Sequence, residues 1–194
     1  MFIAIEGLDG SGGTTQLARL ADRLADGEVV RTREPSAGPV GRLLREALAG
    51  GELGDDVLPY LFAADRRDHL ARTVLPALAR GAVVLSDRYY LSSLAYQAPA
   101  LGLGKVASLN EGFRAPDIHV LLLLPPEVCL ARVQARGEPR ERFETLERLR
   151  RIEQGYREAV ELVRARGERV EAIDASGTPE EVHAAVWRAI GWPG

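Results

Sequence analysis

The chain has 194 residues, of which 46% are hydrophobic, and this is enough for one domain with a substantial core. Its formal charge of −3 argues against nucleic acid as the main partner. Cys129 is the single cysteine, which excludes an internal disulfide and leads us to expect a reducing, cytoplasmic location. The longest apolar stretch, residues 120–126, is far too short to span a bilayer, so we expect no membrane partner.

The first fifteen residues predict a loop that binds phosphate. Residues 2–5 form an apolar run typical of a buried parallel strand, and a helical pattern starts at residue 16. A glycine-rich turn between a strand and a helix can curl its backbone N–H groups round an anion, and the helix dipole adds attraction. The turn reads Gly7, Leu8, Asp9, Gly10, Ser11, Gly12, Gly13, Thr14, Thr15. The Walker pattern G-x-x-x-x-G-K-[ST] fits except at Gly13, which stands in place of the lysine.

Strand and helix patterns alternate along the rest of the chain. We expect strands at residues 28–32, 82–86, 118–124 and 170–173. We expect helices at residues 16–26, 40–48, 55–80 with bends near Pro59 and Pro76, 91–97, 106–113, 126–136, then a long helix to about 166, and 179–190. This alternation predicts a parallel sheet with helices on both faces. Because no linker or internal repeat is present, we expect a single domain over residues 1–194.

Charged residues follow two of the predicted strands. Asp87 ends an apolar strand in the manner of a Walker B carboxylate, so it could hold Mg²⁺ beside the Thr14 hydroxyl. The alternative is that Asp87 only caps the next helix. Arg88 could bind a phosphate through two parallel hydrogen bonds from its guanidinium. Arg33 and Glu34 follow the second strand, at the sheet edge where α/β proteins bind ligands.

These motifs together resemble the thymidylate kinase family. The resemblance is carried by residues 2–12, by Thr32-Arg33-Glu34-Pro35, by Asp87-Arg88-Tyr89 with Ser92, Ser93 and Ala95-Tyr96-Gln97, and by Asp174-Ala175, so it covers essentially the whole chain. It implies phosphorylation of dTMP to dTDP with ATP and Mg²⁺. It also implies the P-loop NTPase-type three-layer α/β/α fold with a five-stranded parallel sheet and a small mobile lid, usually in a homodimer.

The resemblance also implies roles for single residues. ATP would bind at residues 7–15, and Thr14 and Asp87 would hold the metal. Asp9 would accept a hydrogen bond from the sugar 3′-hydroxyl, and Tyr96 would exclude a ribose hydroxyl. The remaining contacts to dTMP would come from Arg33, Arg45 and Arg88 around the phosphate, from Phe62 and Arg66 at the base, and from Glu34, Ser92 and Gln97. Taken singly, an arginine is more often a surface charge, and a phenylalanine at helical spacing is more often core.

A lid is expected at residues 136–147, where Glu141-Arg142-Phe143-Glu144 resembles the family's D-R-x-E segment with Glu in place of Asp. Gly10 stands where one branch of the family carries an arginine in the phosphate loop. The resemblance therefore implies that lid arginines stabilise the transferring phosphoryl group, with Arg142 and Arg136 as candidates and Arg140 beside them. The expected catalytic set is Asp9, Arg88, Arg142 and Arg136. The alternative for the lid arginines is an ordinary solvated surface.

Two other functions stay open at the level of sequence. The chain could be another small kinase of the same architecture, acting on a nucleoside or on a different monophosphate. It could also be a non-catalytic nucleotide-binding protein that lost its activity when Gly13 replaced the lysine. The Arg33-Glu34-Pro35 segment and the Phe62 and Arg66 pair disfavour the first, and retention of Asp9, Asp87 and Arg88 disfavours the second.

Overall fold

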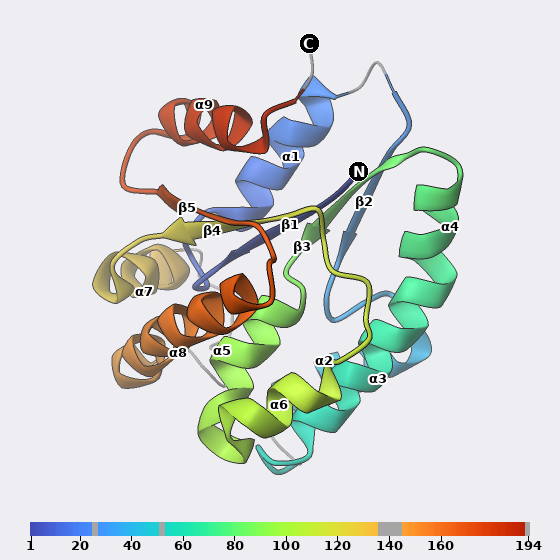
Figure 1. Ribbon diagram of the computed structural model, residues 1–194. Helices are drawn as coiled ribbons and strands as arrows, with labels where there is room; N and C mark the ends of the chain where they lie inside the picture. Colours follow the sequence, from blue (N-terminus) through green and yellow to red (C-terminus); the bar gives the residue numbers. More distant parts are fainter. Residues whose placement is uncertain (25–26, 51–52, 136–144, 193–194) are drawn as a thin grey trace.

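A parallel sheet forms the centre of the molecule (Figure 1). The computed structural model describes residues 1–24, 27–50, 53–135 and 145–192. Within these ranges the sheet has five strands in the order β2-β3-β1-β4-β5. The strands are β1 Phe2–Gly7, β2 Val29–Arg33, β3 Val83–Asp87, β4 Ile118–Leu123 and β5 Val170–Asp174. All four strand pairings are parallel, so the predicted five-stranded α/β sheet is confirmed.

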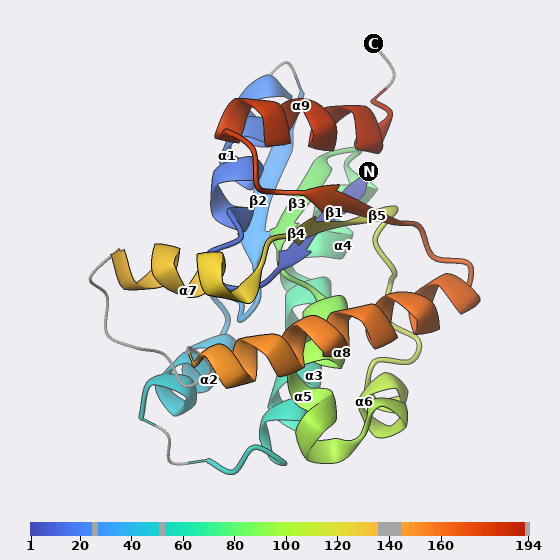
Figure 2. The ribbon, with the colours of Figure 1, turned by 90° about the vertical axis from the view of Figure 1, so that its left-hand side faces the viewer.

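Helices cover both faces of the sheet (Figure 2). α1 (Gly13–Arg23) and α9 (Pro179–Ile190) pack together on one face, while α5 (Tyr90–Leu101) and α8 (Leu146–Ala165) pack together on the other. Every residue of β1 is buried, which explains why its first four residues form an apolar run rather than an alternating pattern. The remaining helices are α2 Pro39–Gly50, α3 Leu58–His69, α4 Leu75–Ala79, α6 Leu103–Leu109 and α7 Pro126–Ala135.

The long helix expected at residues 55–80 differs from the prediction. Its helical part starts at Leu58, so Pro59 lies in the first turn of α3 and produces no bend there. A proline is tolerated at this position because the first-turn N–H groups have no partner within the helix. Near the second predicted bend, at Pro76, a π-helical turn over Leu70–Val74 lies between α3 and α4. Single π-helical turns of this kind occur as local widenings inside α-helices.

Other helix boundaries also differ from the predicted ones. α1 begins at Gly13, inside the glycine-rich turn, rather than at Gln16. α5 runs on through Pro99 to Leu101, and α6 lies a few residues earlier than the predicted 106–113 helix. None of the helices in the described part of the chain combines the length and the apolar character needed to cross a membrane.

The sheet register brings the ligand-binding strand ends together. Ile5 of β1 and Arg33 of β2 both pair with Asp87 at the end of β3. The loop after β1, the segment after β2 and the segment after β3 therefore leave the sheet side by side. This is the edge of a parallel α/β sheet where a binding crevice is expected.

Candidate active site

The glycine-rich turn after β1 forms a tight loop that only glycine can follow at three positions. Gly7, Gly10 and Gly12 have φ values of 149°, 89° and 103°, in the region that L side chains rarely adopt. At Gly10 a Cβ atom would also lie 2.4 Å from the carbonyl oxygen of Cys129 on α7. The first turn of α1 has no side-chain cap and no acidic residue, so its N–H groups and its dipole favour an anion.

Gly13 differs from those three glycines. Its φ is not positive, and a Cβ atom there would lie 3.3 Å from Asp87 Oδ1 and 3.7 Å from Ile5 Cγ2. The backbone at the position of the Walker lysine is therefore compatible with a side chain after a small movement of Asp87.

Thr14 and Asp87, the pair expected to hold a metal ion, do meet. The Thr14 hydroxyl donates a 2.7 Å hydrogen bond to Asp87 Oδ2, and both residues line the same cavity. One hydroxyl and one carboxylate suit Mg²⁺, which keeps several waters and takes phosphate oxygens as further ligands. No group of three or more His, Cys, Asp or Glu side chains that could form a protein-only metal cage occurs among the described residues.

Arg88 is the centre of the hydrogen-bond network beside the loop. Its backbone lies in the left-handed region with φ 70°, which is uncommon for a residue other than glycine. One guanidinium nitrogen donates to the Gly7 carbonyl at 3.0 Å and to the Ser92 hydroxyl at 3.1 Å. The other donates to Asp9 Oδ1 at 2.6 Å. Arg88 therefore joins the loop after β1 to α5, and Asp9 is its charge partner.

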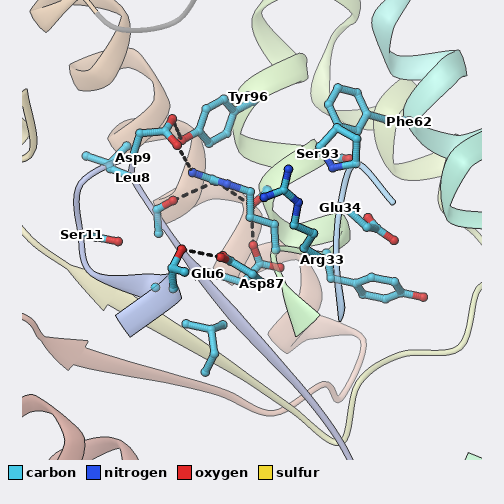
Figure 3. A pocket seen from close by; sticks show the side chains of 18 of the residues that line it. Glu6, Leu8, Asp9, Ser11, Arg33, Glu34, Phe62, Asp87, Ser93 and Tyr96 are labelled. Carbon is cyan, nitrogen blue, oxygen red and sulfur yellow. Dashed lines mark hydrogen bonds and ion pairs between the residues drawn. The ribbon is translucent and has the colours of Figure 1, made fainter. Parts of the chain in front are cut away.

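Tyr96 closes this end of the site. Its hydroxyl donates to Asp9 Oδ2 at 2.9 Å, and the Arg88 guanidinium carbon lies 4.9 Å from its ring centroid. Burial raises the pKa of Tyr96 well above its ordinary value; Arg88 opposes that shift and Asp9 adds to it. The hydroxyl is thus a hydrogen-bond donor at neutral pH. Asp9 and Tyr96 point toward each other in Figure 3.

The end of the site near Phe62 is built on a second buried network. Arg66 is only 1% exposed, and its guanidinium donates to Glu34, to Asn110 and, at 3.0 Å, to Ser93. Glu34 also contacts His69 Nδ1 at 3.1 Å. The Arg66 Nε atom is buried without a hydrogen-bond partner. Arg66 is therefore fixed in one orientation at the cavity wall.

The structure brings most of the predicted substrate residues to one cavity and leaves one out. Arg33, Glu34, Phe62, Arg66, Arg88, Ser92, Tyr96 and Gln97 all line it. Arg45 does not line the cavity. Its guanidinium donates to the backbone carbonyls of Pro35 and Ser36 and so stabilises the segment after β2. The predicted lid arginines Arg136, Arg140 and Arg142 lie outside the described residues.

The cavity has a volume of about 260 Å³ and runs from the phosphate loop to Phe62. Figure 3 shows Ser11, Asp9 and Tyr96 at one end and Phe62 with Glu34 at the other. All nine residues of the glycine-rich turn line it together with the predicted acceptor residues. The glycine-rich loop and an arginine-lined pocket thus share one space.

Several residues of the site carried no signal in the sequence. Tyr156 of α8 reaches the loop, accepting from the Gly7 N–H at 3.2 Å and lying 2.8 Å from the Ser92 hydroxyl. Glu6 is 1% exposed at the end of β1, and its carboxylate accepts from Ser92. Arg132 of α7 donates to the Gly10 carbonyl at 3.5 Å. Only the fold brings Tyr156 and Arg132 beside a loop that is more than 120 residues away.

Comparisons with known proteins agree with this arrangement. A family model for thymidylate kinase matches residues 5–186. A probable thymidylate kinase of Pyrobaculum aerophilum is 43% identical over 192 residues, which is 97% of this chain and 95% of that protein. A thymidylate kinase of Synechococcus sp. is 40% identical over 98% of this chain and 94% of its own length. One from Xanthomonas oryzae pv. oryzae is 44% identical over 78% of this chain and 68% of its own length. This chain belongs to the thymidylate kinase family.

Proposed function

We propose that the protein transfers the γ-phosphoryl group of ATP to dTMP, producing dTDP, with Mg²⁺ as the metal. The observation that carries the proposal is the shared cavity, which unites the glycine-rich loop with Arg33, Arg88 and the Phe62 wall. Family membership makes the chain a kinase. The names of its relatives indicate thymidylate as the acceptor.

The geometry supports different roles for the two ends of the cavity. The loop at residues 7–15 and the first turn of α1 would hold the ATP phosphates through backbone N–H groups. Thr14 and Asp87 would hold Mg²⁺, which neutralises charge on the phosphate oxygens when bound. Phe62, with Arg66 fixed by Glu34, would receive the thymine base. Gln97 and Ser92 would complete the wall.

Arg88 and Asp9 would act where the acceptor phosphate meets the donor. In the structure they pair with each other at 2.6 Å, and side chains of opposite charge at such a place can exchange partners when substrate arrives. We propose that Arg88 turns its guanidinium onto the dTMP phosphate while Asp9 accepts the sugar 3′-hydroxyl. The attacking group is a phosphate oxygen of the substrate, so no protein nucleophile is needed. Catalysis then consists of positioning and charge neutralisation.

The charge that the Walker lysine would supply has to come from elsewhere. We propose that lid arginines within residues 136–147, Arg142 and Arg136 first, reach the γ-phosphate when the lid closes. The structure leaves no room for an arginine at position 10, because a Cβ there would meet the Cys129 carbonyl at 2.4 Å.

A coupled ADP-release assay tests the proposal. Purified protein with ATP and Mg²⁺ is offered dTMP, dUMP, dCMP, dGMP and thymidine in parallel, and formation of dTDP is confirmed by chromatography. We expect dTMP to give the highest kcat/KM. A higher value for another acceptor would make the chain a different small kinase. ATP binding without turnover of any acceptor would make it a nucleotide-binding protein that has lost catalysis.

The remaining features of the proposal concern the whole protein. We propose a single kinase domain over residues 1–194, a homodimer in solution and a cytoplasmic location, with no nucleic-acid partner. The lone Cys129 is buried, and burial raises the pKa of its thiol to about 11, so it stays a neutral thiol. Light scattering after size-exclusion chromatography measures the oligomeric state. A mass near 21.1 kDa would contradict the dimer.

A further inference from the structure

Asn110, where α6 ends, is a buried residue that contacts the cavity wall without lining the cavity. It caps the C-terminus of α6, is 7% exposed and is not among the residues around the cavity. Its Nδ2 atom donates to the backbone carbonyl of Val106 at 2.8 Å. Because the amide nitrogen is turned toward α6, the Oδ1 atom faces Arg66 and accepts from its Nη1 atom. The helix that carries Asn110 therefore sets the direction of this acceptor.

The hydrogen bonds of Arg66 are divided between the two ends of its guanidinium. Nη2 donates to Glu34 and to Ser93, so both of its N–H groups are engaged. Glu34 and Ser93 lie with Phe62 at this end of the cavity (Figure 3). Nη1 donates to Asn110, and Nε has no hydrogen-bond partner among the described residues. Removing Asn110 would leave the guanidinium held by hydrogen bonds at Nη2 and able to pivot about that end.

The orientation of the guanidinium decides which base it can bind. A guanidinium can only donate hydrogen bonds, and the Nε–H and the second N–H of Nη1 remain for a ligand in the cavity that Arg66 lines. Under the proposed function that ligand is thymine, whose carbonyl oxygens accept hydrogen bonds. Cytosine carries an amino group in place of one carbonyl, and an amino N–H that faces a guanidinium leaves two donors opposed. A guanidinium fixed in one orientation should therefore favour dTMP over dCMP more strongly than a mobile one.

We propose that Asn110 is a positioning residue for Arg66 and, through it, a determinant of which base the acceptor site binds. Its amide oxygen fixes the guanidinium at Nη1, while Glu34 and Ser93 fix it at Nη2. Asn110 acts only through Arg66 and touches no substrate. The inference rests on the proposed function, because a preference for dTMP arises here only if the base binds beside Arg66.

The first test needs no substrate. The side-chain N–H signals of Arg66 are observed by NMR in the ligand-free wild type and in Asn110→Leu, with Arg66→Lys to identify them. A guanidinium held at both ends should give separate Nη signals, and Asn110→Leu should broaden or average them. Asn110→Asp, which keeps an oxygen acceptor, should preserve them. Averaged signals in the wild type, or equally separate signals in Asn110→Leu, would overturn the proposal even if dTMP turnover is normal.

The second test compares acceptors. We expect Asn110→Leu to lower kcat/KM for dTMP about tenfold, the effect of losing one hydrogen bond to a charged group, mainly through a higher KM for dTMP. The kcat value and the KM for ATP should change little. The nucleotide dCMP is measured as a competitive inhibitor, so the preference is defined even if dCMP is not phosphorylated. The ratio of the dCMP inhibition constant to the KM for dTMP should fall by a similar factor, because dCMP has no such interaction to lose.

Asn110→Asp separates the positioning of Arg66 from the capping of α6. Asp and Leu both remove the amide that donates to Val106, but only Asp keeps an oxygen for Arg66. Asn110→Asp should therefore retain the preference for dTMP. Ser108→Ala, which removes an exposed hydroxyl that donates to the Lys105 carbonyl of the same helix at 2.8 Å, is the matched control and should leave the NMR signals and the kinetics unchanged.

The outcomes distinguish this inference from the proposed function. Equal losses in Asn110→Asp and Asn110→Leu, or an unchanged ratio in Asn110→Leu, would contradict the positioning role although dTMP is phosphorylated. A wild type that phosphorylates another acceptor but not dTMP would refute the proposed function. The NMR comparison would then still decide whether Asn110 orders Arg66.

Discussion

Restoring a lysine at position 13 is the sharpest test of how this kinase manages without one. The change is sterically mild, because the added Cβ would lie 3.3 Å from Asp87 Oδ1 and the backbone has no positive φ. Replacing glycine in the first turn of α1 gains about 0.5–1 kcal/mol of helix propensity. A positive charge at a helix N-terminus costs about 0.3–1 kcal/mol, so we expect nearly unchanged stability.

The catalytic magnitude separates the two explanations of Gly13. One well-placed electrostatic donor at a transition state is worth about 3–4 kcal/mol, or roughly 10²–10³-fold in kcat. If no other cation reaches the γ-phosphate, Gly13→Lys should raise kcat by that factor. If lid arginines already supply the charge, the gain should be below about tenfold, and we expect this smaller value.

The assay is steady-state turnover of dTMP by wild type, Gly13→Lys, Arg142→Ala and the double variant. We expect Arg142→Ala alone to lose about 100-fold and the lysine to restore most of that loss. Gly13→Met, which adds length without charge, is the matched control and should restore nothing. Effects of the two changes that simply add would refute the compensation by Arg142. A wild type with no turnover would favour the degenerate nucleotide binder.

Three other predictions follow from single contacts. Arg88→Ala should lower kcat/KM for dTMP about 10²-fold while ATP binding measured by calorimetry stays near wild type; a collapse of ATP affinity would move Arg88 to the donor site. Tyr96→Ala should accept ribo-TMP relatively better than the wild type does. Tyr96→Phe should keep the sugar preference but lower turnover, because Asp9 loses a hydrogen bond of 2.9 Å. Competition between dTMP and ribo-TMP measures the sugar preference of both variants. Because the pKa of His119 is raised, against the effect of burial, by its hydrogen bond to Glu168, its contribution to the free energy of unfolding is complete below about pH 6.5 and is lost as pH rises through the pKa of the folded state. In urea unfolding, the stability of His119→Gln should therefore not fall over that pH range.

The three central strands of the sheet were predictable because they are buried on both faces. β1, β3 and β4 are apolar runs followed at once by loop residues, and this pattern fixes both the strand and the point where its ligand-binding end begins. Asp87 and Arg88 could be found in this way, and the structure does place Asp87 beside Thr14. Helix 55–80 was harder, since one apolar pattern spans α3, a π-helical turn and α4 without a break in composition.

The residues that the sequence could not reveal act through long-range contacts. Tyr156 sits in an ordinary helical pattern on α8, and only packing brings its hydroxyl to Gly7. Glu6 and His119 interrupt apolar strands, and a single polar residue in such a run gives no hint of its partner. The role of Arg45 stays a prediction: the family resemblance implies a phosphate contact, while in this structure its side chain donates to the carbonyls of Pro35 and Ser36.

The phosphate loop lacks a basic side chain at two positions, 10 and 13, where the motifs would place one. At position 10 the loop packs so closely on α7 that any side chain would meet the Cys129 carbonyl, and at position 13 the chain carries no side chain although one would fit. The loop therefore offers backbone N–H groups and the α1 dipole, but no positive charge of its own. Among the described residues, Arg88 and Arg132 donate to its backbone, through the carbonyls of Gly7 and Gly10. Arg132 lies on α7, which is followed in the sequence by the proposed lid residues 136–147. The proposed supply of that charge by Arg142 and Arg136 is therefore the prediction that the Gly13→Lys series tests directly.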